Sequence, residues 1–273
     1  MSLLRILRRL LVVSVVVAVL LASAFASRAA AGTTESAAAS ASTRSARMLD
    51  AHASARGVGE TRGLYPSSPV VLHVDGVDTL AFPPATPSAT RPVTVVYLHG
   101  MRGRAENGCP WFRAGASELG WLVCPEAIEA QPDGSWSWGA DVFKQAPVVE
   151  RALRAARENG ASSEPGIAVG FSQGSYVALD LVKARLAKFR GLVLLGAELH
   201  PNAQTLRDAG IVRIALGAGQ RDHVAYASLV EEAKRLSNEG IETRFFDLGG
   251  VGHTYAVDDT SILNDAIAFA GGA

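Results

Sequence analysis

From Leu64 onward the sequence alternates between short runs rich in β-branched and aromatic residues and longer runs with helical periodicity. The run at residues 93–98 is almost continuously apolar, as expected of a strand that is buried on both faces of its sheet. Such strands occur in parallel sheets, because crossover helices cover both faces. The pattern therefore predicts a single α/β domain over residues 63–273, with a mostly parallel sheet and helices on both faces.

The other expected elements follow from the same two periodicities. Strands are predicted at residues 70–74, 79–82, 120–124, 166–169, 191–195, 212–216 and 243–246, and helices at about 141–158, 173–187, 224–238 and 256–270. The first two strands are expected to form an antiparallel pair around Gly76. Only residues 197–210 separate two later strands, which is too short for a large helical cap. A domain with a minimal lid or none is therefore expected.

The N-terminus has the organisation of an export signal. Three arginines within the first nine residues precede the apolar run 10–21. Two sites of the small-x-small type follow, at 24–26 and 29–31, so a signal peptide over residues 1–31 is predicted, with the mature chain beginning between Ser27 and Gly32. The alternative is that the same apolar run is retained as a membrane anchor.

Composition constrains both the segment after the signal and the partners that the chain can bind. Residues 32–62 are dominated by Ala, Ser, Thr, Gly and Arg, and they are expected to form a flexible leader. Lys plus Arg and Asp plus Glu each number 26, so no net charge attracts nucleic acid or an anionic membrane. An exported protein is expected, with no nucleic-acid partner and no membrane contact unless the N-terminal segment is retained.

The chain has two cysteines, Cys109 and Cys124. In an exported protein such a pair predicts a disulfide. The alternative is that Cys124, which ends an apolar run, is a small core residue. No spacing of Cys or His resembles a zinc site, and no metal or cofactor is expected.

One motif has a chemical meaning because of its position. Residues 170–174 fit G-x-S-x-G, and they follow the predicted strand 166–169 and precede an amphipathic run. This is the context of a nucleophile elbow, in which a sharp strand-to-helix turn exposes the serine oxygen. Ser172 is the candidate nucleophile. The alternative is a glycine-rich turn in which Ser172 caps the following helix.

A serine nucleophile needs a base and a residue that orients the base. In chains with this elbow, the acid and the histidine follow the serine in that order. His253, in a glycine-rich loop after the last predicted strand, is the candidate base, and Asp222, after the strand 212–216, is the candidate acid. Asp247 competes for the second role, but it stands close to His253 in sequence.

Acyl transfer also needs hydrogen-bond donors for the oxyanion. Two backbone N–H groups are candidates: that of Gln173, next to the nucleophile, and that of Met101, after the strand 93–98. Three tryptophans are candidates for substrate contact: Trp111, Trp136 and Trp138. The alternative is that they only anchor loops or fill the core.

These motifs together resemble the α/β-hydrolase superfamily, and within it the phospholipase/carboxylesterase branch that includes acyl-protein thioesterases. The matching segments lie at 97–101, 124–125, 135–138, 170–174, 219–222 and 252–253. Secreted polyester depolymerases and feruloyl-type esterases share several of them. Two departures stand out: Ser175 and Tyr176 replace the small residues common after the elbow, and residues 252–255 differ from the thioesterase histidine motif.

The resemblance implies a serine hydrolase that cleaves small carboxylic esters through an acyl-enzyme intermediate. A peptidase or an acyltransferase would use the same triad, because these classes differ in leaving group and acceptor. A catalytically silent binding protein on the same fold is a further alternative, but such proteins usually lack one triad member.

Overall fold

The structure is a computed structural model that describes residues 69–85 and 92–273. The described residues belong to one compact unit. The predicted signal peptide, 1–31, and leader, 32–62, lie outside the described residues. Within the described part of the chain, no helix combines the length and the apolar character needed to cross a membrane.

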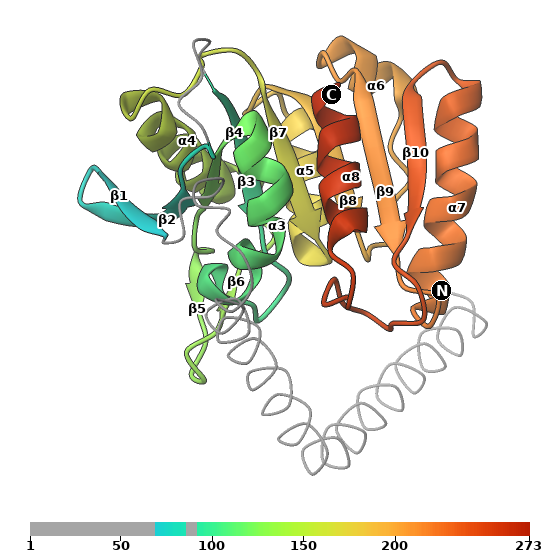
Figure 1. Cartoon of the computed structure of the whole chain (residues 1–273), viewed down its shortest axis with the longest axis horizontal. Helices are drawn as coiled ribbons and strands as arrows, with labels where there is room; N and C mark the ends of the chain where they lie inside the picture. The colour runs from blue at the N-terminus through green and yellow to red at the C-terminus, as the bar shows by residue number, and fades with distance from the viewer. Residues whose placement is uncertain (1–68, 86–91) are drawn as a thin grey trace, which may run out of the picture. The chain divides into compact units, whose positions relative to one another are not determined.

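The unit is built on an eight-stranded sheet with strand order β1-β2-β4-β3-β7-β8-β9-β10 (Figure 1). The strands are β1 (Val70–Val74), β2 (Val77–Phe82), β3 (Val93–Leu98), β4 (Gly120–Cys124), β7 (Gly166–Phe171), β8 (Phe189–Leu195), β9 (Arg213–Ala218) and β10 (Glu242–Asp247). All neighbours from β4 to β10 pair in parallel, whereas β2 is antiparallel to both β1 and β4. The prediction of a mostly parallel sheet is therefore confirmed.

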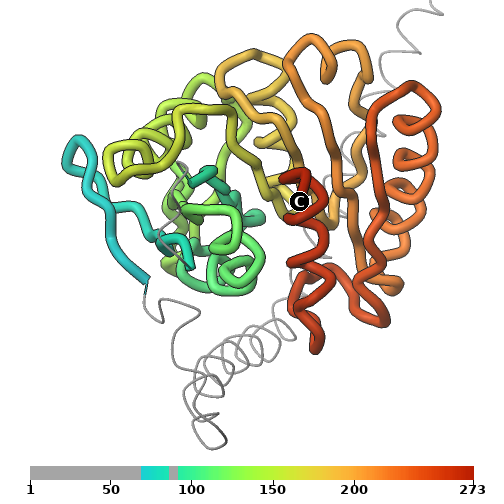
Figure 2. The backbone as a smooth tube through the Cα atoms, turned by 45° about the horizontal axis from the view of Figure 1, so that its top comes forward, coloured from blue at the N-terminus to red at the C-terminus, as the bar shows by residue number. Residues whose placement is uncertain are grey.

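Helices cover both faces of this sheet. They are α3 (Ala105–Leu119), α4 (Val142–Glu158), α5 (Gln173–Lys183), α6 (Ala203–Asp208), α7 (His223–Asn238) and α8 (Ser261–Gly271). One hydrophobic cluster includes Val149 of α4, Val177 of α5 and Leu229 of α7. The other includes Phe112 of α3 and Leu263 of α8. Helices α3 and α8 lie side by side (Figure 1). Figure 2 shows the β1–β2 hairpin, in blue, at one edge of the unit and β10 at the other. The central strands are mostly apolar because each is buried on both faces.

Several elements differ from the sequence-based prediction. Helix α3, helix α6 and a two-stranded hairpin of β5 (Glu129–Ala130) and β6 (Trp136–Ser137) were not expected. Gly108 and Pro110 lie inside α3, and both residues disfavour a helix interior. Tertiary contact explains Gly108, because a Cβ atom there would lie 2.3 Å from the Tyr97 hydroxyl oxygen. The packing of α3 against β3 therefore overrides its local propensity.

The ends of two predicted helices also shift. Helix α5 ends at Lys183 rather than at 187, because Arg185 adopts φ 56° and the Leu186 N–H donates to the Leu181 carbonyl. This is the 6→1 bond of a Schellman motif. Helix α8 begins at Ser261 rather than at 256, and the longer loop before it carries His253.

A disulfide joins Cys109 of α3 to Cys124 at the end of β4, as predicted. The two Cα atoms are 6.0 Å apart, and both residues are buried in the core between α3 and the sheet. A link that closes a loop of this size stabilises a folded domain by roughly 3 kcal/mol. The bridge therefore offsets part of the cost of a glycine and a proline inside α3.

Candidate active site

The G-x-S-x-G segment forms the sharp turn between β7 and α5. Ser172 adopts φ 51° and ψ −117°, a strained conformation for a residue with a Cβ atom. A Cβ atom on Gly170 would lie 2.5 Å from the Gly174 carbonyl oxygen, and one on Gly174 would lie 1.9 Å from that of Leu98. Only glycine fits at these two positions. The Ser172 side chain does not cap α5, contrary to the alternative interpretation of the motif.

The strained turn is tied to the neighbouring strand β8 by hydrogen bonds. The Ser172 N–H donates to the Leu195 carbonyl at 2.8 Å. The buried Ser175 hydroxyl lies 2.8 Å from the Gly170 carbonyl oxygen, and it accepts from the Leu195 N–H at 3.1 Å. Ser175, which the sequence marked only as a departure from a family pattern, therefore holds the elbow in place.

The structure brings the three candidate triad residues together. His253 Nε2 lies 3.0 Å from Ser172 Oγ, and His253 Nδ1 donates to Asp222 Oδ2 at 2.6 Å. Asp222 directly precedes α7 and its side chain is 15% exposed, whereas the His253 side chain is 52% exposed. The Asp222 carboxylate is thus largely screened from water, whereas the His253 imidazole is half exposed to it.

The loop that carries His253 is anchored to the segment that carries Asp222. The Gln220 N–H donates to the Gly249 carbonyl at 2.8 Å, and the Arg221 N–H donates to the Val251 carbonyl at 2.9 Å. The Phe171 ring packs against the imidazole, with centroids 5.0 Å apart. These contacts set the distance between acid and base although the loop has no regular secondary structure.

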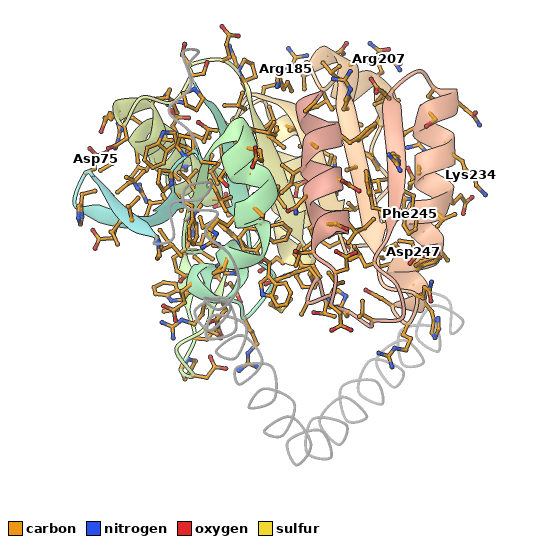
Figure 3. The ribbon with its side chains drawn as sticks, viewed as in Figure 1. Asp75, Arg185, Arg207, Lys234, Phe245 and Asp247 are labelled. Atoms are coloured by element: carbon orange, nitrogen blue, oxygen red, sulfur yellow. A yellow bond between two sulfur atoms is a disulfide. The ribbon has the colours of Figure 1, made fainter. Side chains whose placement is uncertain are left out.

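Asp247, the competing acid, has different partners. Its Oδ2 accepts hydrogen bonds from Gln220 Nε2 and from the Tyr226 hydroxyl, each at 3.0 Å, and its Oδ1 accepts from the Gly249 N–H at 2.8 Å. Burial raises the pKa of the Asp247 carboxyl, but these hydrogen bonds outweigh burial and lower the pKa. Figure 3 shows Asp247 at the end of β10, beside α7. Asp247 supports the loop and does not contact His253.

The two candidate oxyanion donors belong to two segments that adjoin Ser172. Met101 is part of the turn after β3, which is closed by a 3.0 Å bond from the Gly103 N–H to the Gly100 carbonyl. A Cβ atom on Gly100 would lie 3.3 Å from Ser172 Cβ, so this turn approaches the serine closely. The Gln173 N–H belongs to the open first turn of α5, where no intrahelical acceptor exists. Among the described residues, the Met101 N–H makes no backbone hydrogen bond.

The three candidate tryptophans occupy different environments. Trp138 is completely buried, so the expectation that it borders the cleft is wrong in this structure. Trp136 in β6 and Trp111 in α3 are half-buried, and the Trp111 ring lies 6.3 Å from that of Tyr255. Only these two retain surface for contact with a ligand. Sequence reasoning could not separate the three, because burial depends on how the β5–β6 hairpin folds back on the sheet.

A cavity that could hold a ligand lies away from Ser172. A cavity of about 400 Å³ opens at the amino ends of β3, β7 and β8, with Arg157, Arg185 and Lys188 among its lining residues. Figure 3 shows Arg185 at the end of the unit opposite Asp247. Across residues 69–85 and 92–273, no group of three or more His, Cys, Asp or Glu side chains is arranged to hold a metal ion.

Known proteins with similar structures identify the fold of this chain. No family model and no curated protein matches the chain. An uncharacterized protein from Bacillus cereus is 20% identical with a TM-score of 0.57, and the match covers 68% of this chain but only 61% of that one. A carboxylesterase from Bacillus cereus is 16% identical, with a TM-score of 0.54 and coverage of 70% and 93%. A "predicted CIB-like hydrolase" from Thermoplasma acidophilum is 14% identical, with a TM-score of 0.53 and coverage of 76% and 98%. The sheet order, the elbow after β7 and these similarities together show that the chain has the α/β-hydrolase fold.

Proposed function

We propose that this protein is an exported serine hydrolase that cleaves small carboxylic esters through an acyl-enzyme intermediate. The observation that carries the proposal is the unbroken hydrogen-bonded series from Ser172 Oγ through His253 to Asp222 Oδ2. Serine is a poor nucleophile near neutral pH, and a histidine within hydrogen-bond distance supplies the base that activates it. The strained elbow supports the same role, because it presents the serine oxygen above the sheet.

In the proposed mechanism, Ser172 Oγ attacks the ester carbonyl carbon while its proton moves to His253 Nε2. The carbonyl oxygen becomes an oxyanion, which the N–H groups of Met101 and Gln173 stabilise. When the bond to the alcohol breaks, His253 gives its proton to the leaving oxygen. Water then attacks the acyl carbon with His253 again acting as base. The bond to Ser172 Oγ breaks, His253 returns the proton to Ser172 Oγ, and the acid product leaves. Asp222 keeps the proton of the imidazole on Nδ1 and stabilises the charged ring.

The preference for small soluble esters rests on the openness of the site. The connection between β8 and β9 contains only the six-residue helix α6, and no larger cap interrupts this part of the described chain. His253, beside the nucleophile, is exposed over half of its side chain. A substrate can therefore reach Ser172 without displacing a lid formed by the described residues.

The purified protein is expected to hydrolyse p-nitrophenyl acetate and butyrate without activation at an interface, because no cap has to open. Rates should be measured against acyl length and across the solubility limit, beside a heat-denatured sample that corrects for spontaneous hydrolysis. A jump in rate on emulsified long-chain triglyceride, with little turnover of acetate, would contradict the proposal. Faster cleavage of matched anilides than of esters would instead favour a peptidase, and acyl transfer to added alcohols in preference to water would favour an acyltransferase.

Export is a separate part of the proposal and has its own test. The buried disulfide supports it, because such bridges persist in oxidising compartments. Mature protein recovered from the native host is expected to begin between Ser27 and Gly32, since signal peptidase cleaves after small residues. Intact-mass measurement decides this. A mass that still includes residues 1–26 would show that the segment is retained as an anchor.

A further inference from the structure

We infer that Trp138 is a positioning residue that sets the spacing between the two oxyanion donors, an inference that rests on the proposed function. Trp138 belongs to the Ser-Trp-Ser-Trp segment at residues 135–138, whose role the triad does not explain. It touches no part of the cleft, because its side chain is completely buried. Its hydrogen bonds, however, reach both chain segments that carry a candidate donor.

The two bonds connect Trp138 to the two segments that carry the candidate donors. The indole Nε1–H donates to the His99 carbonyl at 2.9 Å, two residues before Met101. The backbone N–H of Trp138 donates to Gln173 Oε1 at 3.0 Å. Gln173 is also the residue whose backbone N–H is the second candidate oxyanion donor. One residue therefore links the turn after β3 to the start of α5.

Trp138 is itself held rigidly enough to act as this link. Gln145 Nε2 donates to the Trp138 carbonyl at 3.3 Å and to the Gly139 carbonyl at 3.1 Å. The indole ring also packs against the buried His99 ring, with centroids 5.5 Å apart. Gln145 thus anchors Trp138 to α4, outside the two donor-bearing segments, and the His99 contact adds a second link to the turn after β3.

The rest of the hairpin binds the same turn. The Trp136 N–H donates to the Gly103 carbonyl at 2.9 Å, and the Arg102 N–H donates to Ser137 Oγ at 3.2 Å. Together with the indole bond to His99, these contacts restrain the turn before and after Met101. The Met101 N–H keeps a defined direction, which matters because an oxyanion donor acts only within about 2.7–3.1 Å of the oxygen.

The test is Trp138→Phe, which keeps an aromatic ring but removes the indole N–H, with Trp121→Phe as the matched control. Trp121 is half-buried near the amino end of β4, away from Ser172. Trp138→Phe is expected to lower kcat/KM for p-nitrophenyl butyrate by about 10- to 100-fold with little change in KM, less than the roughly 10² to 10³ lost when a donor is removed outright. Trp121→Phe is expected to stay within about twofold of the wild type.

A second readout separates positioning of the donors from general damage. Ser172 Oγ adds to the carbonyl carbon of a trifluoromethyl ketone, its proton passes to His253, and the ketone oxygen becomes an oxyanion. Trp138→Phe is expected to weaken inhibition by a butyl trifluoromethyl ketone by the same factor as kcat/KM, because both report oxyanion stabilisation. Inhibition by the corresponding alcohol, which forms no oxyanion, is expected to change by less than about twofold.

Two outcomes overturn the inference: a folded Trp138→Phe protein with kcat/KM within twofold of the wild type, or equal weakening of the ketone and the alcohol. If Trp138→Phe does not fold, Gln173→Met decides, since it removes the acceptor of the Trp138 N–H but keeps the Gln173 N–H. About tenfold loss in kcat/KM with the same inhibitor pattern supports the inference, and an unchanged rate overturns it.

Failure of the proposed function would give a different result, because the wild type would then neither turn over the ester nor bind the ketone covalently.

Discussion

Replacing Ser172 with alanine is expected to lower kcat for ester hydrolysis by roughly 10⁶-fold, and His253→Ala is expected to cost about as much. The two losses should be similar because the triad acts as a unit: without the base the hydroxyl is not activated, and without the hydroxyl the base has nothing to activate. Labelling by a fluorophosphonate probe, followed by mass measurement of the labelled peptide, should place the label on Ser172 and on no other residue.

Matched controls exist elsewhere in the fold. Ser163 is exposed at the cavity on the amino side of the sheet, and His73 is exposed on β1. Ser163→Ala and His73→Ala should therefore keep full turnover and labelling. Thermal unfolding of all four variants should match that of the wild type closely, because alanine at position 172 keeps the Cβ atom and therefore the backbone strain. Activity above about one per cent in folded Ser172→Ala or His253→Ala would exclude the assignment.

The second large effect is expected at Asp222. Asp222→Asn should keep the geometry but lower kcat by about 10⁴-fold, because an amide can donate a hydrogen bond to Nδ1 and leave the proton on the wrong nitrogen of His253. The loss should appear in kcat more than in KM, since the substrate does not touch this residue. Steady-state kinetics on p-nitrophenyl butyrate, with active sites counted by the probe, measure both constants.

Asp247→Asn provides the sharpest comparison, because Asp247 ends β10 and Asp222 follows the parallel neighbour β9. Asp247 receives its hydrogen bonds from Gln220, Tyr226 and the Gly249 N–H, so its substitution should loosen the histidine loop and lower kcat by about tenfold or less. Tyr226→Phe, which removes one of these bonds, should have a smaller effect in the same direction. If Asp247→Asn were the more damaging of the two aspartate substitutions, the identity of the acid would be wrong.

Much of the architecture could be predicted from local patterns. The central strands are short and mostly apolar on both faces because they lie between two helical layers, and that burial is visible as continuous runs such as Val93–Leu98. The elbow could be located because only glycine fits beside a serine in so sharp a turn. The disulfide between Cys109 and Cys124 was predicted from two cysteines in a chain whose N-terminus is predicted to be an export signal.

The remaining features depend on contacts between segments far apart in the chain. Helix α3 contains Gly108 and Pro110, which disfavour a helix, and its packing on Tyr97 and the disulfide stabilise it in the folded protein. The sequence favoured Asp222 over Asp247 only by spacing, because Asp247 stands close to His253 in the chain. The course of the histidine loop is what brings His253 against Asp222, and this course depends on tertiary contacts.

Ser172, His253, Met101 and Gln173 could be named from sequence because turns, glycines and strand ends are local properties of the chain. The roles of Ser175 and Trp138 could not, since a buried side chain is defined by what covers it. Hydrogen bonds such as those from Trp138 to His99 and to Gln173 form only when the hairpin, β3 and α5 are already packed together. The sequence alone thus determined which groups could react, and the tertiary structure decided which groups hold them in position.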